Sequence, residues 1–356
     1  MRLLSSKNSL RKYTLKKVNS NCPICNSREA TQMWAASCEQ QASHFLSPLK
    51  DSDKYQELKN YIKFLQGTPY ISINKCSICQ FTYSYPYIAG DKKFYDLIFA
   101  TSNNYPKERW EFSESISIIY NERIKNPKIL EIGAGDGAFL KQILNKKITT
   151  QSNITAIEYS ILGKSKIEEE LGIKCFPIDI RAAENKLPFK KYDFICLFQV
   201  LEHLDDIHNL MNKLKLLLTK NGKILIAVPN EKIIEFNELN GALLDMPPNH
   251  VGRWSKKSFK KFCEINNMIL VKHSVEPFSI KNAIFMIFSY RFLKRSQKNN
   301  TLEAFIRYKL NGKLSWFLTR LVVILDCISS PEIIYKILFE NKKLGGESQL
   351  VYISKK

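Results

Sequence analysis

A regular alternation of apolar runs and amphipathic stretches between Lys128 and Asn230 constrains the fold more than any other feature of the sequence. The runs have the length of buried strands, and the stretches between them have helical spacing. The runs are KILEIG, NITAIEYS, KCFPID, YDFICLFQV and GKILIAVPN, and the helical stretches are GAFLKQILNK, GKSKIEEELG and LEHLDDIHNLMNKLKLLLT. Such alternation predicts an α/β protein with a mostly parallel sheet covered on both faces, whose ligands bind outside the carboxyl ends of the strands.

A glycine-rich turn, GAGDGA, joins the first strand to the first helix. Gly133, Gly135 and Gly137 allow the backbone to turn tightly and to approach a ligand closely. The turn satisfies the dinucleotide fingerprint G-x-G-x-x-[GA], which is a weak signal when it stands alone. It therefore predicts a ligand site and leaves open whether the ligand is a nicotinamide cofactor.

Acidic residues lie at the ends of the neighbouring strands. Glu131 comes two residues before Gly133, and Asp136 lies within the turn. Glu158 ends the second strand, where a carboxylate is placed to accept hydrogen bonds from both hydroxyls of a ribose. Asp179 ends the third strand and is a candidate acceptor for an adenine amino group; the alternatives are a solvated loop residue or a helix N-cap.

Two cysteine pairs lie in the N-terminal part of the chain. CPIC contains Cys22 and Cys25, and CSIC contains Cys76 and Cys79. Two such pairs supply four thiolates for one structural zinc ion, with no position left open for catalysis. The stretch SPLKDSDKYQELKNYIKFL between them predicts a helix. Unrelated thiol pairs or a redox dithiol remain alternatives. The five scattered cysteines are expected to be small buried hydrophobes: Cys38, Cys175, Cys196, Cys263 and Cys327.

The composition indicates one main domain with appendages and a strongly basic surface. The chain has 356 residues, 44% of them apolar, and a formal net charge of +20. Such a charge favours anionic partners, although a general bias toward lysine explains it equally well. The N-terminal stretch lacks the apolar core of a secretory signal, and no run reaches the ~18 apolar residues of a membrane span. We therefore expect a cytoplasmic protein.

Together the motifs give a family resemblance. LEIGAGDG, Glu158, LPFKKYDFICLFQVLEHLDD and GKILIAVPN resemble a class I S-adenosylmethionine-dependent methyltransferase over residues 109–277. The stretch QVLEHL after the fourth strand distinguishes this class from the nicotinamide enzymes. The resemblance implies a Rossmann-like sheet with an antiparallel last strand, for which SQLVYISKK at the C-terminus is the candidate.

The resemblance also implies roles for single residues around S-adenosylmethionine. Glu131 and the amides of the glycine turn would hold the amino-acid end of the cofactor, and Glu158 would hold the ribose. Asp179 and Ile180 would flank the adenine, and Gln199 would line the methionine side. Arg109 begins RWEF, a segment that can close over the cofactor in this family or simply start a helix.

The double C-x-x-C region before the core resembles bacterial methyltransferases that modify sugars. Some of these, the sugar C-methyltransferases, carry a Tyr-x-Glu-His motif after the fifth strand. This chain reads MPPNHVGRWS there, so His250 is kept while the Tyr and Glu are absent. The departure favours O-methylation over C-methylation.

Two histidines are candidates for the catalytic chemistry, because removing a proton from a hydroxyl suits an imidazole. His250 lies in a proline-stiffened loop and is the first candidate as general base or substrate contact, with loop packing as the alternative. His203 follows Glu202 and is a candidate for direct substrate contact, with a structural role as the alternative. Arg253 and Trp254 are expected either to meet the substrate or to anchor the loop. Packing or surface roles are expected for His44, His208 and His273.

A basic, aromatic insert precedes the last strand. Residues 281–320 carry nine basic side chains and one acidic one, Glu303, in stretches with helical spacing. This segment is interpreted as a lid over the substrate pocket or a homodimer contact, as a peripheral contact with an anionic membrane at its inner face, or, with least support, as a nucleic-acid surface.

The sequence thus predicts an S-adenosylmethionine-dependent O-methyltransferase of a sugar, nucleotide-sugar or glycolipid, in surface-glycan or natural-product biosynthesis. A sugar C-methyltransferase, an RNA methyltransferase and a non-catalytic methyltransferase-like partner module are the alternatives. The expected organisation is a basic tail (1–20), a zinc-binding domain (21–90), a helical linker over the cofactor site (91–125), a methyltransferase core (126–277), a basic helical insert (278–346) and a final strand (347–356).

Overall fold

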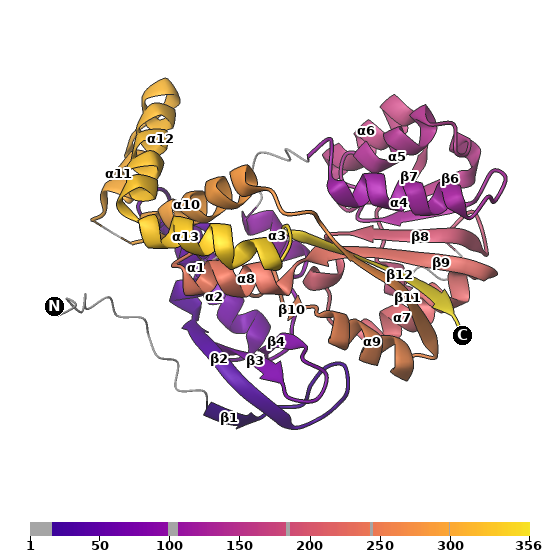
Figure 1. Ribbon diagram of the computed structural model, residues 1–356, viewed down its shortest axis with the longest axis horizontal. Coiled ribbons are helices and arrows are strands. Elements are labelled where there is room, and N and C mark those ends of the chain that lie inside the picture. The colour runs from indigo at the N-terminus through magenta and orange to yellow at the C-terminus, as the bar shows by residue number, and fades with distance from the viewer. Residues whose placement is uncertain (1–15, 99–105, 183–185, 243–244, 299) are drawn as a thin grey trace.

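The computed structural model describes residues 16–98, 106–182, 186–242, 245–298 and 300–356, so most of the predicted basic tail lies outside the described residues. Within these ranges the strands form a seven-stranded and a five-stranded sheet, and a group of helices lies beside them (Figure 1).

The larger sheet has the order β11-β12-β9-β8-β5-β6-β7. Strands β5 to β9 run parallel, whereas β12 lies between β9 and β11 and is antiparallel to both. The prediction of a parallel sheet with an antiparallel last strand is therefore confirmed. The bounds are β5 (Ile129–Ile132), β6 (Ile154–Ile157), β7 (Lys174–Phe176), β8 (Tyr192–Phe198), β9 (Leu218–Pro229), β11 (Met268–Val275) and β12 (Ser348–Lys355).

Helices cover both faces of this sheet, as the apolar strands require. Apolar side chains of α4, α5 and α6 form one core with the strands, and those of α7 and α9 form the core on the other face. The bounds are α4 (Trp110–Asn121), α5 (Ala138–Asn145), α6 (Ile161–Leu171), α7 (Ile207–Leu217) and α9 (Lys256–Ile265), with short 3-10 turns at Gln151–Asn153 and Ile180–Ala182.

The prediction of one long helix after the fourth strand is wrong. A 3-10 turn at Leu201–His203 ends before α7 begins at Ile207, and Asp206 adopts a φ of 47°. The break is held by Arg181, whose Nη1 donates to the backbone oxygen of Asp205 at 3.1 Å and to its carboxylate at 2.7 Å. The break turns the backbone so that Glu202 and His203 lie at the carboxyl end of the sheet.

The smaller sheet has the order β1-β2-β3-β4-β10 and is antiparallel throughout. Two helices lie between β2 and β3 in the chain, and the predicted helix with Leu58 and Ile62 on its buried face is confirmed as α2. The bounds are β1 (Lys16–Asn19), β2 (Glu29–Ser37), β3 (Tyr70–Cys76), β4 (Thr82–Tyr85), β10 (Gly252–Arg253), α1 (Cys38–Phe45), α2 (Ser52–Gln66) and α3 (Lys92–Ile98).

Strand β10 belongs to the central part of the chain yet completes the N-terminal sheet. Gly252 pairs with Tyr83 of β4, and Ser84 donates its amide hydrogen to the Val251 oxygen at 2.9 Å. Trp254 is fully buried, with its ring 4.8 Å from that of Phe81. The loop before β10, which carries His250, is thereby fixed to the N-terminal sheet.

The predicted insert is helical, and in Figure 1 its helices α10 and α13 lie alongside α8, to the left of the large sheet. Apolar side chains of α8, α10 and α13 form its core, which includes Phe236, Phe288 and Ile337. The bounds are α8 (Glu231–Leu239), α10 (Ile280–Ser296), α11 (Leu302–Lys309), α12 (Gly312–Ser329) and α13 (Pro331–Phe339), followed by a 3-10 turn at Asn341–Lys343.

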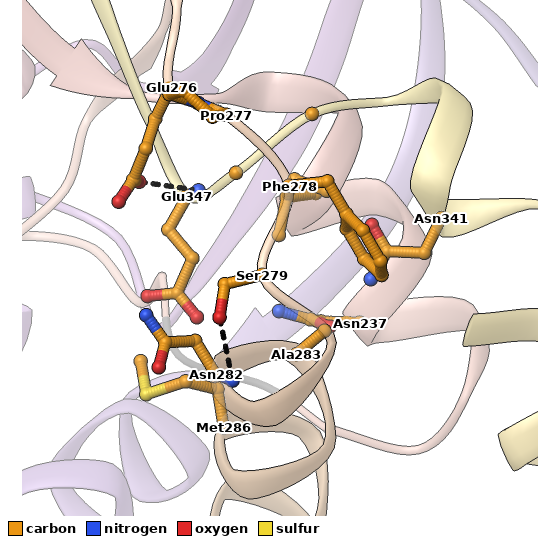
Figure 2. Close-up of a pocket in the computed structure, with 13 residues that line it drawn as sticks. Asn237, Glu276, Pro277, Phe278, Ser279, Asn282, Ala283, Met286, Asn341 and Glu347 are labelled. Atoms are coloured by element: carbon orange, nitrogen blue, oxygen red, sulfur yellow. Dashed lines mark hydrogen bonds between the residues drawn. The ribbon is translucent and has the colours of Figure 1, made fainter. Parts of the chain in front are cut away.

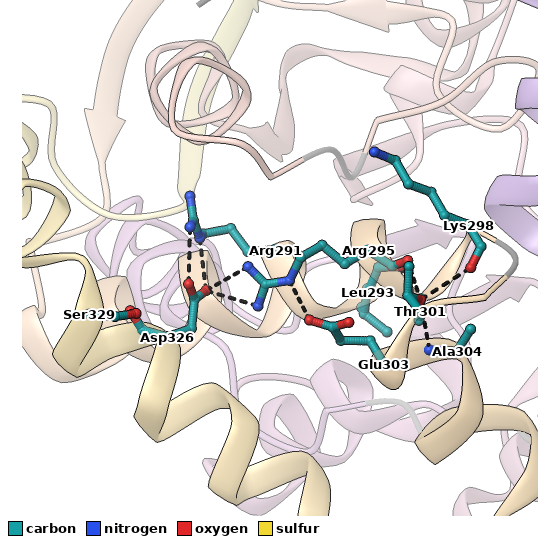
Figure 3. A network of polar contacts seen from close by, with 10 residues as sticks. Arg291, Leu293, Arg295, Lys298, Thr301, Glu303, Ala304, Asp326 and Ser329 are labelled. Carbon is teal, nitrogen blue, oxygen red and sulfur yellow. Dashed lines mark hydrogen bonds and ion pairs between the residues drawn. The ribbon is translucent and has the colours of Figure 1, made fainter. Parts of the chain in front are cut away.

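Ion pairs join the helices of the insert to one another (Figure 3). Arg291 makes a two-pronged contact with Asp326 at 2.9 and 3.0 Å, and Arg295 bridges Asp326 at 3.1 Å and Glu303 at 2.6 Å. Burial opposes ionisation of Asp326, but hydrogen bonds from both arginines lower its pKa. Two of the basic side chains that we considered as contacts for an anionic partner, Arg291 and Arg295, therefore form ion pairs within the insert.

Across the described ranges, no helix has both the length and the apolar character that a bilayer crossing requires.

Candidate functional site

The glycine turn forms an acidic cradle at the carboxyl end of β5. Gly133, Gly135 and Gly137 have φ values of 72°, 58° and 80°, which only glycine adopts readily. A Cβ at Gly133 would lie 2.4 Å from Cγ2 of Val200, so the turn also needs glycine for its approach to the segment after β8. The turn therefore has the backbone conformation that the sequence predicted for a ligand-binding loop.

Two carboxylate oxygens in this cradle have no partner. Glu131 is 3% exposed, and its Oε2 and the Oδ1 of Asp136 lack hydrogen bonds within the described chain. Burial, with the nearby charges of Glu158 and Asp136, raises the pKa of Glu131 well above its usual value. Buried acceptors without donors fit a ligand that brings an ammonium group, which is the amino-acid end of S-adenosylmethionine.

Glu158 lies at the end of β6, beside the turn. Its Oε2 accepts from the Gly135 amide and its Oε1 accepts from the Ser160 amide, both at 2.7 Å. These bonds fix the carboxylate, and each oxygen keeps a further lone pair for a hydroxyl. The residues present therefore fit a ribose at this position.

Asp179 and Ile180 lie just after β7, where both have partners within the protein. Asp179 binds Arg181 with distances of 2.7 to 3.0 Å, and although burial opposes it, these hydrogen bonds lower the pKa of the carboxyl group. Ile180 is 4% exposed and packs in the core. Contacts of these two residues with an adenine remain predictions.

Gln199 connects the cofactor side to α4 and to the last strand. It has a φ of 57°, and its Nε2 donates to Glu111 Oε1 and to Ser348 Oγ, each at 3.1 Å. Glu111 is buried and also lies 3.4 Å from Arg109. The RWEF segment therefore both starts α4 and reaches the edge of the site.

The two candidate histidines lie together. The rings of His203 and His250 meet edge to face with centroids 4.5 Å apart. His250 Nδ1 donates to Asp245 Oδ1 at 2.6 Å, and His203 Nδ1 donates to the Asn249 oxygen at 2.8 Å. Each imidazole therefore has its Nδ1 fixed and its Nε2 left as an acceptor.

The pKa values of the two imidazoles are shifted in opposite directions. Burial and the neighbouring His250 lower the pKa of His203 to about 3. Burial also disfavours the charged form of His250, but the Asp245 carboxylate overcomes this and raises its pKa. His203 is thus held neutral beside an Asp–His pair.

Glu202 completes this group. It is 2% exposed, and neither carboxylate oxygen has a hydrogen-bond partner among the residues that the structure describes. Burial raises the pKa of Glu202 to about 7. Its Oε1 lies 3.9 Å from Nε2 of His203. The sequence showed Glu202 only as a neighbour of His203, and Asp245 was missed because a loop residue five positions upstream of His250 gives no pattern.

A pocket lies between α8, α10 and the turn before β12 (Figure 2). Glu276 and Glu347 both line it; Glu276 accepts from the Glu347 and Ser348 amides at 2.9 and 3.1 Å. Burial and Glu276 raise the pKa of Glu347 to about 7. Further lining side chains are Asn237, Phe278, Ser279, Asn282, Met286 and Asn341. Ser348, whose amide donates to Glu276, also accepts from Gln199, so one residue links the pocket lining to Gln199.

The four paired cysteines converge as predicted. Cys22 and Cys79 have their sulfurs 3.5 Å apart, Cys25 and Cys76 have theirs 3.6 Å apart, and all four lie within 4.8 Å of one another. Four sulfurs at ~2.3 Å from a zinc ion at tetrahedral angles would be separated by ~3.8 Å, so the spacing fits. Hydrogen bonds from Cys22 and Cys79 lower the pKa of Cys76. The cluster closes the β1–β2 and β3–β4 turns.

The remaining candidates have structural partners. Arg253 binds Glu238 at 2.7 Å, and Trp254 is buried, so both anchor the loop. His208 lies 3.0 Å from the Ile24 oxygen of the first cysteine pair, and His273 lies 2.8 Å from Gln349. His44 packs edge to face on Phe45.

Comparison with known proteins agrees with this architecture. Residues 107–272 match a family model described as a methyltransferase domain. Fold, glycine turn and family match define the central part of the chain as a class I methyltransferase domain, of the class that uses S-adenosylmethionine.

A curated relative is malonyl-[acyl-carrier protein] O-methyltransferase 1 from Ilyobacter polytropus, 26% identical over 170 residues, or 47% of this chain. The match spans 59% of that protein's length. Similar solved structures include coclaurine N-methyltransferase, with 13% identity, 89% and 93% of the two chains covered and a TM-score of 0.46. A methyltransferase from Archaeoglobus fulgidus has 16% identity, 74% and 100% coverage and a TM-score of 0.42.

Proposed function

We propose that this protein transfers a methyl group from S-adenosylmethionine to a hydroxyl oxygen of a sugar, nucleotide-sugar or glycolipid. The observation that carries the proposal is the meeting of two groups at one edge of the sheet. One is the acidic glycine cradle with the unpartnered Oε2 of Glu131, and the other is the His203–His250 pair. Val200, next to the cradle, lies two residues before Glu202, so the two groups adjoin.

The cofactor, when bound, supplies a methyl group on a positively charged sulfur, which is already activated as a leaving group. The protein then has to bind, orient and exclude water. Glu131 and the glycine amides would receive the amino-acid end, Glu158 the ribose, and Gln199 the methionine side. Glu111 and Ser348 hold Gln199 in place for this role.

His250 is the first candidate to take up the proton of the acceptor hydroxyl. Its Nδ1 hydrogen bond to Asp245 fixes the tautomer with a free Nε2, and Asp245 stabilises the imidazolium that forms. His203 lies against His250, and its lowered pKa keeps it neutral, which supports a role in orienting the hydroxyl.

The lining of the neighbouring pocket favours a polyhydroxylated acceptor. Vicinal hydroxyls could donate hydrogen bonds to the carboxylates of Glu276 and Glu347. The side-chain amides around them could both donate and accept, and Phe278 offers an apolar face. The curated relative is named for a malonyl acceptor. Two carboxylates in this pocket disfavour a negatively charged malonyl group, so the acceptor here is proposed to differ.

A structural zinc ion on the four cysteines belongs to the same proposal. So does a peripheral location of the insert on an anionic membrane, which would suit a lipid-linked acceptor. Helix α12 has no buried residue, and its exposed apolar side chains are Leu314, Trp316, Phe317, Leu321, Ile324, Leu325 and Ile328. A homodimer contact through the same face is the alternative.

The test is calorimetric titration with S-adenosylhomocysteine, followed by methyl-transfer assays on nucleotide-sugars and glycolipids. Micromolar binding that Glu158→Ala abolishes and Glu170→Ala keeps would support the cofactor site, because Glu170 is exposed on α6. A folded wild type that binds no cofactor would overturn the enzyme and favour a partner module. Methyl incorporation at carbon, with deuterium exchange there, would favour C-methylation.

A further inference from the structure

We propose that Glu202, His203 and His250 bind one divalent transition-metal cation at the acceptor side of the site. This site is separate from the four cysteines, and its metal would face the acceptor. The inference rests on the proposed function only for its chemical purpose, because binding of the metal itself can be measured without turnover.

The first argument is the geometry of the three side chains. Glu202, His203 and His250 each offer a ligand atom within 4.8 Å of the other two. Because Nδ1 of each imidazole is already engaged, the available nitrogen is Nε2 in both. Two imidazole nitrogens and one carboxylate are a common set for a divalent metal that keeps positions open for substrate.

The second argument is the state of Glu202. This carboxylate is 2% exposed, and both of its oxygens lack a partner among the described residues. An unpartnered buried carboxylate is costly, and the usual remedy is a hydrogen-bond donor, a counter-ion or a metal. A divalent cation between Glu202 and the two Nε2 atoms would supply what the protein's own residues do not.

The third argument is the shell around the two histidines. A histidine that binds a metal usually donates its other ring hydrogen to a carboxylate or a backbone carbonyl, which fixes the ring and raises its basicity. His250 donates to the Asp245 carboxylate, and His203 donates to the Asn249 carbonyl. The Val251 amide also donates to the Glu202 backbone oxygen at 2.9 Å. This bond fixes the loop that carries His250 against the turn that carries Glu202 and His203.

The ligand types indicate the class of metal. Two imidazoles and one carboxylate suit Zn²⁺, Fe²⁺, Co²⁺, Ni²⁺ or Mn²⁺, whereas Mg²⁺ and Ca²⁺ prefer oxygen ligands alone. The four cysteines offer thiolates alone, which bind Zn²⁺ and are poor ligands for Mn²⁺. The two sites therefore differ enough in chemistry to be filled and measured independently.

A cation here would act on the acceptor through its open positions. A hydroxyl that binds a divalent cation loses its proton to solvent more readily, and its oxygen then attacks the methyl carbon as the carbon–sulfur bond breaks. The sulfur keeps the bonding pair. In this state His203 and His250 act through the metal, and neither receives the proton.

The experiment is a titration with Mn²⁺ of the full chain loaded with one Zn²⁺ per chain, followed by electron paramagnetic resonance of the free Mn²⁺ ion. Zinc on the cysteines leaves Mn²⁺ only sites of nitrogen and oxygen ligands. We expect one Mn²⁺ per chain, lost in Glu202→Gln and in His250→Ala and kept in His273→Gln, whose imidazole lies in β11. Asp245→Asn should weaken binding by about 10–100-fold, because this residue orients a ligand.

Thermal melting of each variant shows whether it is folded, and Glu202→Gln keeps the shape of the side chain. No Mn²⁺, Zn²⁺ or Fe²⁺ bound beyond the cysteine site, or binding that survives Glu202→Gln and His250→Ala, would overturn the proposal. Titration of the same samples with S-adenosylhomocysteine tests the proposed function separately from the proposed metal site. If metal binding fails while cofactor binding and methyl transfer persist, only the metal is wrong; if cofactor binding fails, the proposed function is wrong.

Discussion

At the scale of single residues, Glu131 shows a conflict between stability and binding. Its carboxyl group is buried with one oxygen unpartnered, and the carboxylates of Glu158 and Asp136 lie near it. A group whose pKa is raised on folding stabilises the folded state fully below its unfolded pKa of about 4.3, and this stabilisation is lost as the pH rises toward the folded pKa. At neutral pH the ligand-free protein is therefore destabilised by this residue.

We expect Glu131→Gln to raise the free energy of unfolding of the ligand-free protein by about 1–3 kcal/mol at neutral pH, because the buried charge is removed. The gain should grow from pH 5 upward, while affinity for S-adenosylhomocysteine falls. Chemical denaturation across a pH series and calorimetry measure both effects, with Glu170→Gln on α6 as the exposed control. Equal or lower stability in the variant would mean that Glu131 is satisfied in the free protein.

Single residues also show where sequence reasoning reached its limit. Glu131, the glycines and Glu158 lie at strand ends, so their neighbourhood follows from the periodic pattern. The ion pair of Asp179 with Arg181 was missed because both residues lie after the strand, where no repeat fixes their side chains. His250 was a candidate on its loop position, yet its partner Asp245 has no sequence signal.

At the scale of elements, the large sheet could be predicted and the short links could not. Strands β5 to β9 are apolar on both faces, which only a covered parallel sheet explains. The break before α7 was missed because Leu201 and Leu204 fit a helical repeat, and Arg181 holds the break from a distant part of the chain. Strand β10 has two residues, too few for any periodic signal.

We expect the five-stranded sheet and its cysteine cluster to hold the acceptor loop with His250 in place. We expect them to have little influence on cofactor binding. Cys76 ends β3, and this sheet continues through β4 to β10, which begins two residues after His250. Chelation of zinc, or Cys76→Ser, should lower kcat by at least about tenfold with little change in affinity for S-adenosylhomocysteine, because second-shell support of a site is typically worth about 10–100-fold. The measurements are zinc content, calorimetry and methyl transfer on the same sample.

The control for this prediction is Cys327→Ser, which changes a thiol on α12 away from the cluster. If zinc removal lowers cofactor affinity as much as it lowers turnover, the prediction that the sheet supports only the acceptor side is wrong. A variant that loses zinc and keeps full activity would show that the sheet holds its shape without the ion.

At the scale of the whole molecule, the exposed apolar face of α12 is a feature that the cofactor site does not explain. The face carries Trp316 and Phe317, and the chain has a net charge of +20. An apolar helical face beside basic side chains suits the surface of an anionic membrane. The same face would also suit a second copy of the chain.

We expect the protein to sediment with vesicles that contain anionic lipid and to stay in solution with neutral ones. Replacing Trp316 and Phe317 by Ala should weaken vesicle binding by at least about tenfold, because burying each ring contributes about 1.5–3 kcal/mol. Phe64→Ala, on the exposed side of α2, is the control. If the double variant instead dissociates a dimer in analytical ultracentrifugation and vesicles never bind, the face is a subunit contact.

Strand β10 has a consequence for how this protein can be divided. A fragment cut to residues 107–272, the boundaries of the family match, would keep the glycine turn and β10 but lose β4, the strand on which β10 rests. It would also lose β12, which lies between β11 and β9 in the large sheet. The acceptor loop would then have no scaffold. A hybrid that joins the N-terminal sheet of this chain to the core of another methyltransferase should therefore be inactive. It should be active only if β4 and β10 both come from the same parent protein.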